Sequence, residues 1–287
     1  MKKYLLIALL LAASMPLVAQ HHQGPTNLTG QINTRHKGKL LKMKLKTAVT
    51  FVTPPAVDLT NWAPEPITQS YKNCYAYATV YTARTMLYNF TNQITNHPES
   101  SVFSTAFLQK MLYPRSRTCR NNGADTYYAS QVLQKNGVIF RDDFADDCTD
   151  AVITTSLLEK AKKYRVIALQ LYKECDNAET KVIAIKSSLT NHRPVVVAWL
   201  STNSFNGGGY GMEIWKPTAN ELNKSACRNG SNHAFCIIGY DDNKFGGAFH
   251  IQNSWSLGWG IQDRAWITYK DMAQFSAFAI EFSEPAR

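Results

Sequence analysis

The sequence predicts an α+β fold in which a helical first lobe precedes a β-rich second lobe. Helical spacing of apolar residues dominates up to about residue 164, whereas β-branched, aromatic or alternating runs bounded by Gly, Asn and Asp dominate after it. The chain has 287 residues, 45% of them hydrophobic, which is enough to bury one large core or two packed lobes. A cleft between two such lobes is a natural place for a functional site.

Three segments of the first half carry a helical pattern. From Cys74 to about residue 89, apolar residues recur every three or four positions, which places them on one helix face. Cys74 therefore lies in the first turn of a predicted helix. Two further helices are expected at about 104–112 and 124–136, and Gly137 after the second one favours a positive-φ cap.

Five segments of the second half are predicted strands, at about 166–171, 194–200, 234–240, 248–253 and 264–269. The third and fourth flank a turn rich in Asp, Asn and Gly, so they are expected to form an antiparallel hairpin. His233 and Asn253 stand equally far from Asn243, near the middle of that turn. Hairpin pairing is therefore expected to bring the two side chains into contact.

The first residues are typical of a secretory signal. Lys2 and Lys3 precede an almost unbroken apolar run over 4–18, and Ala19 suits cleavage, which predicts a signal peptide at 1–19. We therefore expect export to a periplasm or the extracellular space. The run is shorter than the roughly 20 apolar residues that span a bilayer, and no later run matches it, so no membrane span is expected.

Residues 20–56 are expected to form a basic pro-segment or N-terminal arm, which leaves 57–287 as the compact domain. The formal net charge of the whole chain is +10, and six basic residues fall within 35–46. Leu41, Met43 and Leu45 alternate with lysines, which is the period-two pattern of a half-buried strand. That pattern favours a solvated edge strand over attraction to anionic surfaces, and no nucleic-acid partner is expected.

Cys74 and His233 are the candidate reactive residues. The helix dipole at a first turn lowers a thiol pKa and enriches the thiolate, although a Cys there can also be a buried small hydrophobe or half of a disulfide. If the amide oxygen of Asn253 accepts from one ring nitrogen of His233, the other nitrogen can face a thiol. The alternative interpretation is that His233 and Asn253 merely end strands.

Three segments together resemble the papain-like cysteine peptidases. Gln69–Ala78 is similar to the family's nucleophile segment, and Asn232–Tyr240 is similar to its histidine segment. Asn253–Gly260 resembles its Asn-Ser-Trp-Gly-x-x-Trp-Gly motif. The resemblance implies a papain-like two-lobed fold over 57–287, with an active-site cleft between a helical N-terminal lobe and a β-rich, barrel-like C-terminal lobe.

The same resemblance implies the catalytic roles. Cys74 would be the nucleophile, His233 the general base and then acid, and Asn253 the residue that orients the histidine. Gln69 would donate its side-chain amide to the oxyanion, together with the Cys74 backbone N–H. Trp255 would shield the bond between the histidine and the asparagine from water.

The substrate cleft departs more from the family. Gly123 with Ala124 stands where the family has a Gly pair that binds the substrate backbone, and Ala234 suggests a cleft that accepts an apolar side chain. Tyr71 and Lys72 replace the usual Cys and Gly before the nucleophile, so one expected disulfide is absent. The long separation from the nucleophile to the histidine suggests an insertion at about 205–224.

Two of the six cysteines are expected to be free, and the other four allow three disulfide pairings. The nucleophile is free, and Cys236 lies in an apolar strand. The resemblance favours a disulfide between Cys119 and Cys148, which leaves Cys175 with Cys227. Metal binding is the competing use, but no close Cys-x-x-Cys or His-x-x-x-His spacing occurs, so neither a metal nor a cofactor is expected.

These features predict a secreted, monomeric cysteine peptidase that hydrolyses protein or peptide substrates through a Cys-His-Asn triad and a thioester. Two alternatives remain open. The same triad could pass the thioester to an amine and act as a transpeptidase or cross-linking acyl transferase. The fold could also serve as a catalytically silent binding protein, which is suggested by the altered loop before Cys74.

Overall fold

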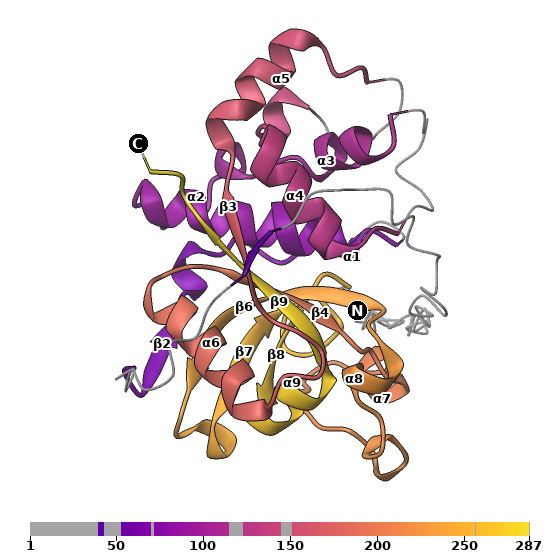
Figure 1. Cartoon of the computed structure of the whole chain (residues 1–287). Coiled ribbons are helices and arrows are strands. Elements are labelled where there is room, and N and C mark those ends of the chain that lie inside the picture. Colours follow the sequence, from indigo (N-terminus) through magenta and orange to yellow (C-terminus); the bar gives the residue numbers. More distant parts are fainter. Residues whose placement is uncertain are drawn as a thin grey trace, which may run out of the picture.

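The computed structural model describes residues 40–42, 53–69, 72–114, 123–144, 151–255 and 257–286. Figure 1 shows helices from the first half of the chain gathered in one lobe above a lobe built on a β-sheet. The α+β class and the two-lobed arrangement predicted from the sequence are confirmed.

A long continuous helix opens the helical lobe. It consists of α1 (Cys74–Ala76), a π-helical stretch (Tyr77–Arg84) and α2 (Thr85–Thr91). Three further helices follow, α3 (Thr105–Leu112), α4 (Thr126–Asn136) and α5 (Thr155–Ala161), with single 3-10 turns at Thr60–Trp62, Glu99–Ser101, Arg141–Asp143 and Lys162–Tyr164. The three predicted helices are therefore confirmed, whereas α5 was not predicted.

Capping side chains set where α3 and α4 begin. The Ser104 side chain accepts a hydrogen bond from the Phe107 N–H, and the Asp125 side chain accepts one from the Tyr127 N–H. Helix α4 ends at Gly137, whose φ of +74° is the positive-φ cap expected there. A Cβ at this glycine would lie 1.9 Å from the Ala161 carbonyl oxygen, so the ends of α4 and α5 approach closely only because no side chain is present.

The other lobe is built on one sheet of nine strands among the described residues. The strands are β1 (Leu41–Lys42), β2 (Ala56–Asp58), β3 (Ile167–Tyr172), β4 (Val195–Trp199), β5 (Ile214–Trp215), β6 (His233–Asp241), β7 (Ala248–Gln252), β8 (Arg264–Thr268) and β9 (Ser276–Ser283). They lie in the order β1-β3-β9-β4-β6-β7-β8-β5, and β2 pairs with β6. All five predicted strands are confirmed, whereas β9 and the short strands β2 and β5 were not predicted.

Strands β6 and β7 form the expected antiparallel hairpin. The register between β6 and β7 shifts between Ile237 and Gly239, at the position where β2 pairs with β6 on its other side. A Cβ at Gly239 would lie 2.5 Å from the Val57 carbonyl oxygen, which explains why glycine stands at this close approach. The hairpin places the start of β6 near the end of β7, at the edge of the helical lobe.

The basic arm contributes an edge strand, as expected. Strand β1 ends the sheet order and pairs in parallel with β3. The Lys42 side chain is exposed, whereas Leu40 is buried and donates its backbone N–H to the Tyr127 hydroxyl on α4. The other residues of 35–46 lie outside the described residues, and the division into signal peptide, arm and catalytic domain stays a prediction.

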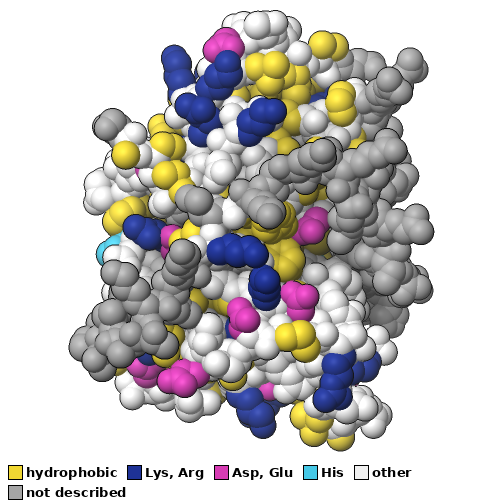
Figure 2. Space-filling model, viewed as in Figure 1, with side chains coloured by type: hydrophobic (Ala, Val, Ile, Leu, Met, Phe, Trp, Pro, Cys, Tyr) yellow, Lys and Arg dark blue, Asp and Glu magenta, His cyan; other side chains and the backbone are white. Residues whose placement is uncertain are grey.

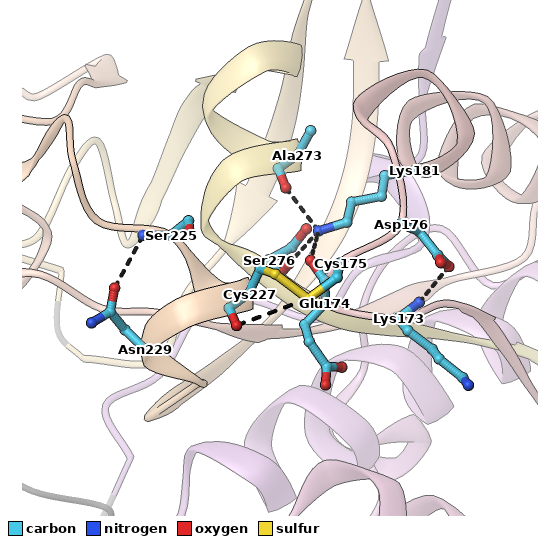
Figure 3. Close-up of a disulfide and its surroundings, with 10 residues drawn as sticks. All are labelled: Lys173, Glu174, Cys175, Asp176, Lys181, Ser225, Cys227, Asn229, Ala273 and Ser276. Atoms are coloured by element: carbon cyan, nitrogen blue, oxygen red, sulfur yellow. Dashed lines mark hydrogen bonds between the residues drawn. A yellow bond between two sulfur atoms is a disulfide. The ribbon is translucent and has the colours of Figure 1, made fainter.

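Four helices accompany the sheet: α6 (Ala178–Thr190), α7 (Asn203–Asn206), α8 (Ala226–Asn229) and α9 (Tyr269–Phe275). The disulfide between Cys175 and Cys227 is present and ties α8 to the connection between β3 and α6 (Figure 3). The expected pair Cys119 and Cys148 lies outside the described residues. Cys236 is free and buried, as expected.

A buried ammonium group reinforces the region of this disulfide. Figure 3 shows Lys181 pointing from α6 toward the end of α9. Its Nζ donates to the carbonyl oxygens of Glu174, Ala273 and Ser276 at 2.8, 2.9 and 2.8 Å. The Lys181 side chain thus supplies a donor to carbonyl groups from the segment between β3 and α6, from α9 and from the start of β9.

A second buried cation joins the long helix to the residue that follows the last strand. Arg84 donates from Nη1 to the Glu284 carboxylate at 2.8 Å and from Nε to the Tyr164 carbonyl oxygen at 3.1 Å. Its guanidinium also lies 4.8 Å from the centre of the Phe103 ring. The helix that begins with Cys74 is therefore held at its middle by Tyr164 and by Glu284, the residue after β9.

Basic side chains also gather on the helical lobe, at the top of the face shown in Figure 2. Helix α5 and the turn after it carry Lys160, Lys162, Lys163 and Arg165. Basic residues therefore cluster on the helical lobe as well as in the N-terminal arm. None of the helices in the described part of the chain is long and apolar enough to cross a membrane.

Candidate active site

Cys74 is the first residue of the long helix, which packs against β6. The helix begins there because the Asn73 carbonyl oxygen accepts hydrogen bonds from the N–H groups of Ala76 and Tyr77. Only 4% of Cys74 is exposed. Its thiol is within hydrogen-bonding range of the backbone N–H of Ala234, so the fold brings the thiol beside the residue that follows His233.

The environment of Cys74 favours a protonated thiol. Burial raises its pKa from 9.0 to about 11, against the lowering effect of hydrogen bonds from the Ala234 and Tyr75 backbone. The sequence-based expectation of a lowered pKa is therefore wrong in direction. A thiolate gains from the helix dipole, but at this depth the loss of its hydration is the larger effect.

His233 and Asn253 are in contact, as was expected from the predicted hairpin. His233 Nε2 lies 2.7 Å from Asn253 Oδ1, and both residues are buried. Because an amide oxygen can only accept, Nε2 carries the proton and Nδ1 holds a lone pair. Among the described residues Nδ1 has no hydrogen-bond partner. Burial also lowers the pKa of His233 from 6.5 to about 4, so the ring is neutral near pH 7.

Hydrogen bonds to Asp263 fix the backbone of Asn253 and of Trp255. The Asn253 N–H donates to the Asp263 carbonyl oxygen at 2.8 Å, and the Trp255 N–H donates to its carboxylate at 3.1 Å. Asp263 is fully buried and has a φ of +59°. Sequence reasoning missed this residue, although Asp tolerates positive φ better than most residues and follows a Gly-containing turn.

Trp255 covers the imidazole. The two ring centres lie 4.3 Å apart with an interplanar angle of 34°. Trp259, in contrast, is buried and donates its indole N–H to the Phe205 carbonyl oxygen at 2.8 Å, so it packs beneath the site. The ring of Trp255 therefore limits the access of water to the face of His233 that it covers.

Gln69 is tied to the same turn. Its backbone N–H donates to the Ser254 carbonyl oxygen at 2.7 Å, and its side-chain Oε1 accepts from the Ser254 hydroxyl at 2.8 Å. The serine thus orients the carboxamide through its oxygen, and the amide nitrogen is the part that can donate. Residues 70 and 71, which link Gln69 to the start of the helix, lie outside the described residues.

The predicted substrate-binding residues lie on both lobes. Gly123 and Ala124 precede α4, which packs against α1, and the Gly123 carbonyl oxygen accepts from the Tyr113 hydroxyl at 2.8 Å. Ala234 is 2% exposed and contributes its backbone N–H beside the thiol. Contact of these residues with a substrate stays a prediction.

A thiol at a helix start, on a two-lobed α+β fold with a buried imidazole bonded to an amide, is the arrangement of a papain-like cysteine protease. The chain belongs to the papain family of cysteine proteases, because the model of that family matches residues 68–280. No curated protein matches the sequence. The family assignment confirms the resemblance seen in the three motifs.

Solved structures show the same fold at low sequence identity. Xylellain, a cysteine protease from Xylella fastidiosa, is 18% identical, with a TM-score of 0.65 over 86% of this chain and 92% of that one. Digestive procathepsin L 3 of Tenebrio molitor larval midgut is 15% identical, with a TM-score of 0.62 over 87% and 76%. Bromelain protease from Ananas comosus, solved with the E64 inhibitor, is 15% identical, with a TM-score of 0.59 over 81% and 100%.

Proposed function

We propose that this protein is an exported cysteine peptidase that hydrolyses peptide bonds through a thioester on Cys74. The observation that carries the proposal is the buried bond of 2.7 Å between His233 Nε2 and Asn253 Oδ1. That bond commits one ring nitrogen to the amide and leaves Nδ1, which has no partner among the described residues, to accept a proton.

In the first half of the proposed reaction, Cys74 Sγ attacks the carbonyl carbon of the substrate while its proton passes to His233 Nδ1. The carbonyl π electrons move to oxygen and form an oxyanion. When this tetrahedral species collapses, the C–N bond breaks and Nδ1–H protonates the leaving amine. The acyl group remains on sulfur as a thioester, and the imidazole is neutral again.

In the second half, Nδ1 removes a proton from water while the water oxygen attacks the thioester carbon. Collapse of the second tetrahedral species breaks the C–S bond, and Nδ1–H returns the proton to Cys74. The imidazole is thus cationic only between the uptake and the return of the proton. Asn253 Oδ1 stabilises that cation and holds the ring plane, because its hydrogen bond becomes charge-assisted when the ring is protonated.

Two donors are proposed for the oxyanion. One is the Cys74 backbone N–H, which lies at the helix start, where intrahelical acceptors are absent. The other is the side-chain amide of Gln69, whose oxygen is held by the Ser254 hydroxyl at 2.8 Å. Each such donor is typically worth about 3 kcal/mol of barrier when it is aimed at the developing charge.

Export is supported by two features of different kinds. The basic residues and apolar run at the front of the chain have the composition of a secretory signal. The disulfide between the exposed residues Cys175 and Cys227 suits an oxidising compartment. The proposed substrates are therefore peptides or proteins met in a periplasm or outside the cell.

The test compares Cys74→Ala with Cys236→Ala, because these are the two free cysteines in the described part of the chain and both are buried. An epoxysuccinyl inhibitor alkylates a catalytic thiol. We expect the wild type and Cys236→Ala to be labelled and to cleave a peptide library, and Cys74→Ala to do neither while keeping its circular dichroism spectrum. Unchanged labelling of Cys74→Ala would refute the proposal.

Mass spectrometry of the products from the same reactions separates hydrolysis from acyl transfer. Peptides that gain one water at each cut support hydrolysis. Ligated or cross-linked products in the presence of added amines would instead indicate that the thioester of Cys74 passes to nitrogen.

A further inference from the structure

The connection between β4 and β6 places one aromatic ring against the candidate catalytic residues. Phe205, on α7, is fully buried. Its ring centre lies 5.4 Å from that of Trp255, edge to face at 74°, and 6.0 Å from that of His233. Since Trp255 itself stacks on His233 at 4.3 Å, the three rings form one contiguous group.

A buried carboxylate fixes the residue before this phenylalanine. Glu221 is only 4% exposed, and its Oε1 accepts from the Ser204 backbone N–H at 3.0 Å. Its Oε2 accepts from the Ser204 hydroxyl and from the Thr218 N–H. The Ser204 oxygen in turn accepts from the Trp215 indole N–H at 3.1 Å. Hydrogen bonds to Ser204 and Thr218 outweigh the effect of burial and lower the pKa of Glu221 to about 2.

The chain just before α7 is hydrogen-bonded to Asn232, the residue before His233. The Asn232 carboxamide accepts from the Ser201 N–H at 2.7 Å and donates to the Ser201 carbonyl oxygen at 3.2 Å. The Ser201 hydroxyl donates to Asn206, at the end of α7. Hydrogen bonds therefore fix Ser204 and Asn206, the two neighbours of Phe205 in the chain. The Phe205 carbonyl oxygen itself accepts from the Trp259 indole N–H.

A hydrophobic core does not require this arrangement of polar groups. A buried carboxylate loses its hydration and is retained at low cost only where several donors compensate it. Here two of the three donors belong to Ser204, in the turn that carries Phe205, so the energy of the network depends on the position of that turn. The ring has little freedom to move away from Trp255.

We propose that Phe205 is a positioning residue of the active site, which Glu221 holds in place through Ser204. Its ring supports Trp255 on His233 and so keeps the imidazole aligned between Asn253 and the thiol. The catalytic consequence rests on the function proposed above, whereas the effect on the histidine does not. Phe205 does not touch the reacting atoms and acts only through the two rings.

The test compares Phe205→Leu with Phe275→Leu. Phe275 is also fully buried and packs in the same aromatic cluster, at 5.7 Å from Trp199 and 5.2 Å from Trp215. Both changes remove a ring from the core, so both lower stability. Glu221→Gln is a second perturbation, because it keeps the shape of the side chain but replaces one acceptor oxygen by a donor.

The first measurement is the proton NMR signal of the His233 Nε2–H, recorded in a Cys74→Ala background to prevent self-cleavage. A hydrogen-bonded and shielded imidazole proton resonates far downfield, and His233→Gln identifies the signal by its loss. We expect a sharp signal in the background protein and in Phe275→Leu, and a signal broadened by exchange with water in Phe205→Leu and Glu221→Gln.

The second measurement is peptide hydrolysis without the Cys74→Ala change. Because misplacement of a catalytic group by about 1 Å can cost about a hundredfold in rate, we expect kcat to fall by between tenfold and a hundredfold in Phe205→Leu. We expect KM to change by less than about twofold, since the ring does not contact substrate. Phe275→Leu should retain the wild-type kcat.

Equal NMR signals in Phe205→Leu, Glu221→Gln and Phe275→Leu would overturn the inference, whatever the activity. An active wild type whose kcat is unchanged in Phe205→Leu would overturn it as well. If the signal broadens as expected but the wild-type protein cleaves no peptide, the positioning role is supported and the proposed function fails. The two proposals can therefore fail separately.

Discussion

The buried imidazole of His233 should make the stability of the protein depend on pH. Burial lowers the pKa of His233 from 6.5 to about 4 in the folded state, whereas an unfolded chain exposes the ring to water. Between these two values the unfolded state binds more protons than the folded state. Stability is therefore fully present above about pH 6.5 and is lost as the pH falls through the folded-state pKa.

The magnitude follows from the two pKa values. Each pKa unit corresponds to about 1.4 kcal/mol, so the difference between 6.5 and about 4 limits the effect of His233 to roughly 3 kcal/mol. Linkage distributes this loss over the titration, and about 2 kcal/mol of it falls between pH 7 and pH 5. His250, whose pKa burial also lowers to about 4, should add a loss of similar size.

The assay is urea unfolding, followed by tryptophan fluorescence at pH 7 and pH 5 in a Cys74→Ala background. His233→Gln keeps a donor for the Asn253 amide oxygen but cannot be protonated. We expect the free energy of unfolding to fall by about 2 kcal/mol less on acidification in His233→Gln than in the background protein. His250→Asn is the matched control, since it removes the other depressed histidine.

An equal pH dependence in the background protein and in His233→Gln would refute this reasoning. It would mean that the ring of His233 is hydrated in solution, or that its protonated form gains as much from Asn253 as it loses by burial. Loss of pH dependence only in His250→Asn would assign the whole effect to the histidine on β7.

Three further changes test the fold. Gly137→Ala should lower the free energy of unfolding by more than about 2 kcal/mol, because the new Cβ would collide with a backbone carbonyl group; Gly230→Ala, at a similar φ of +72° with nothing within 4 Å, should cost about 1 kcal/mol in the same urea titration. Lys181→Met leaves three carbonyl oxygens without their donor and should cost about 3 kcal/mol or more, measured by thermal unfolding. Reduction of the Cys175–Cys227 disulfide, whose cysteines are 52 residues apart, should cost up to about 4 kcal/mol, measured with and without a thiol reductant.

The helices and strands that could be predicted from the sequence are those whose apolar residues recur regularly on one face. The helix from Cys74 and the hairpin around Asn243 have strong periodicity and distinct turn residues, so local rules were sufficient. Helix α6 was not predicted because its buried face includes Lys181 and Ser188, which interrupt the apolar stripe. Strand β9 follows α9 directly, without a Gly or Pro to mark the change from helix to strand.

The site was predictable where residues lie close in the chain or match a motif, and less so where tertiary contacts decide. The contact between His233 and Asn253 was expected from the hairpin, although the register, which pairs Cys236 with Gln252, does not place the two residues directly opposite each other. Glu221 was not singled out in the sequence, and only the fold shows its carboxylate buried against Ser204. The same limit applies to the thiol of Cys74, since a helix start indicates a dipole but says nothing about the depth of burial.

The two pKa directions together constrain how the proposed nucleophile can form. Burial raises the pKa of Cys74 to about 11 and lowers that of His233 to about 4, so burial disfavours the thiolate and the imidazolium alike. A separated thiolate and imidazolium would cost both groups their hydration. For the reaction proposed above, we therefore expect proton transfer to Nδ1 to accompany bond formation at the substrate carbon, where negative charge passes on to the oxyanion. The donors proposed from Gln69 and the helix start would then compensate the oxyanion charge at a place where burial leaves no water to do so.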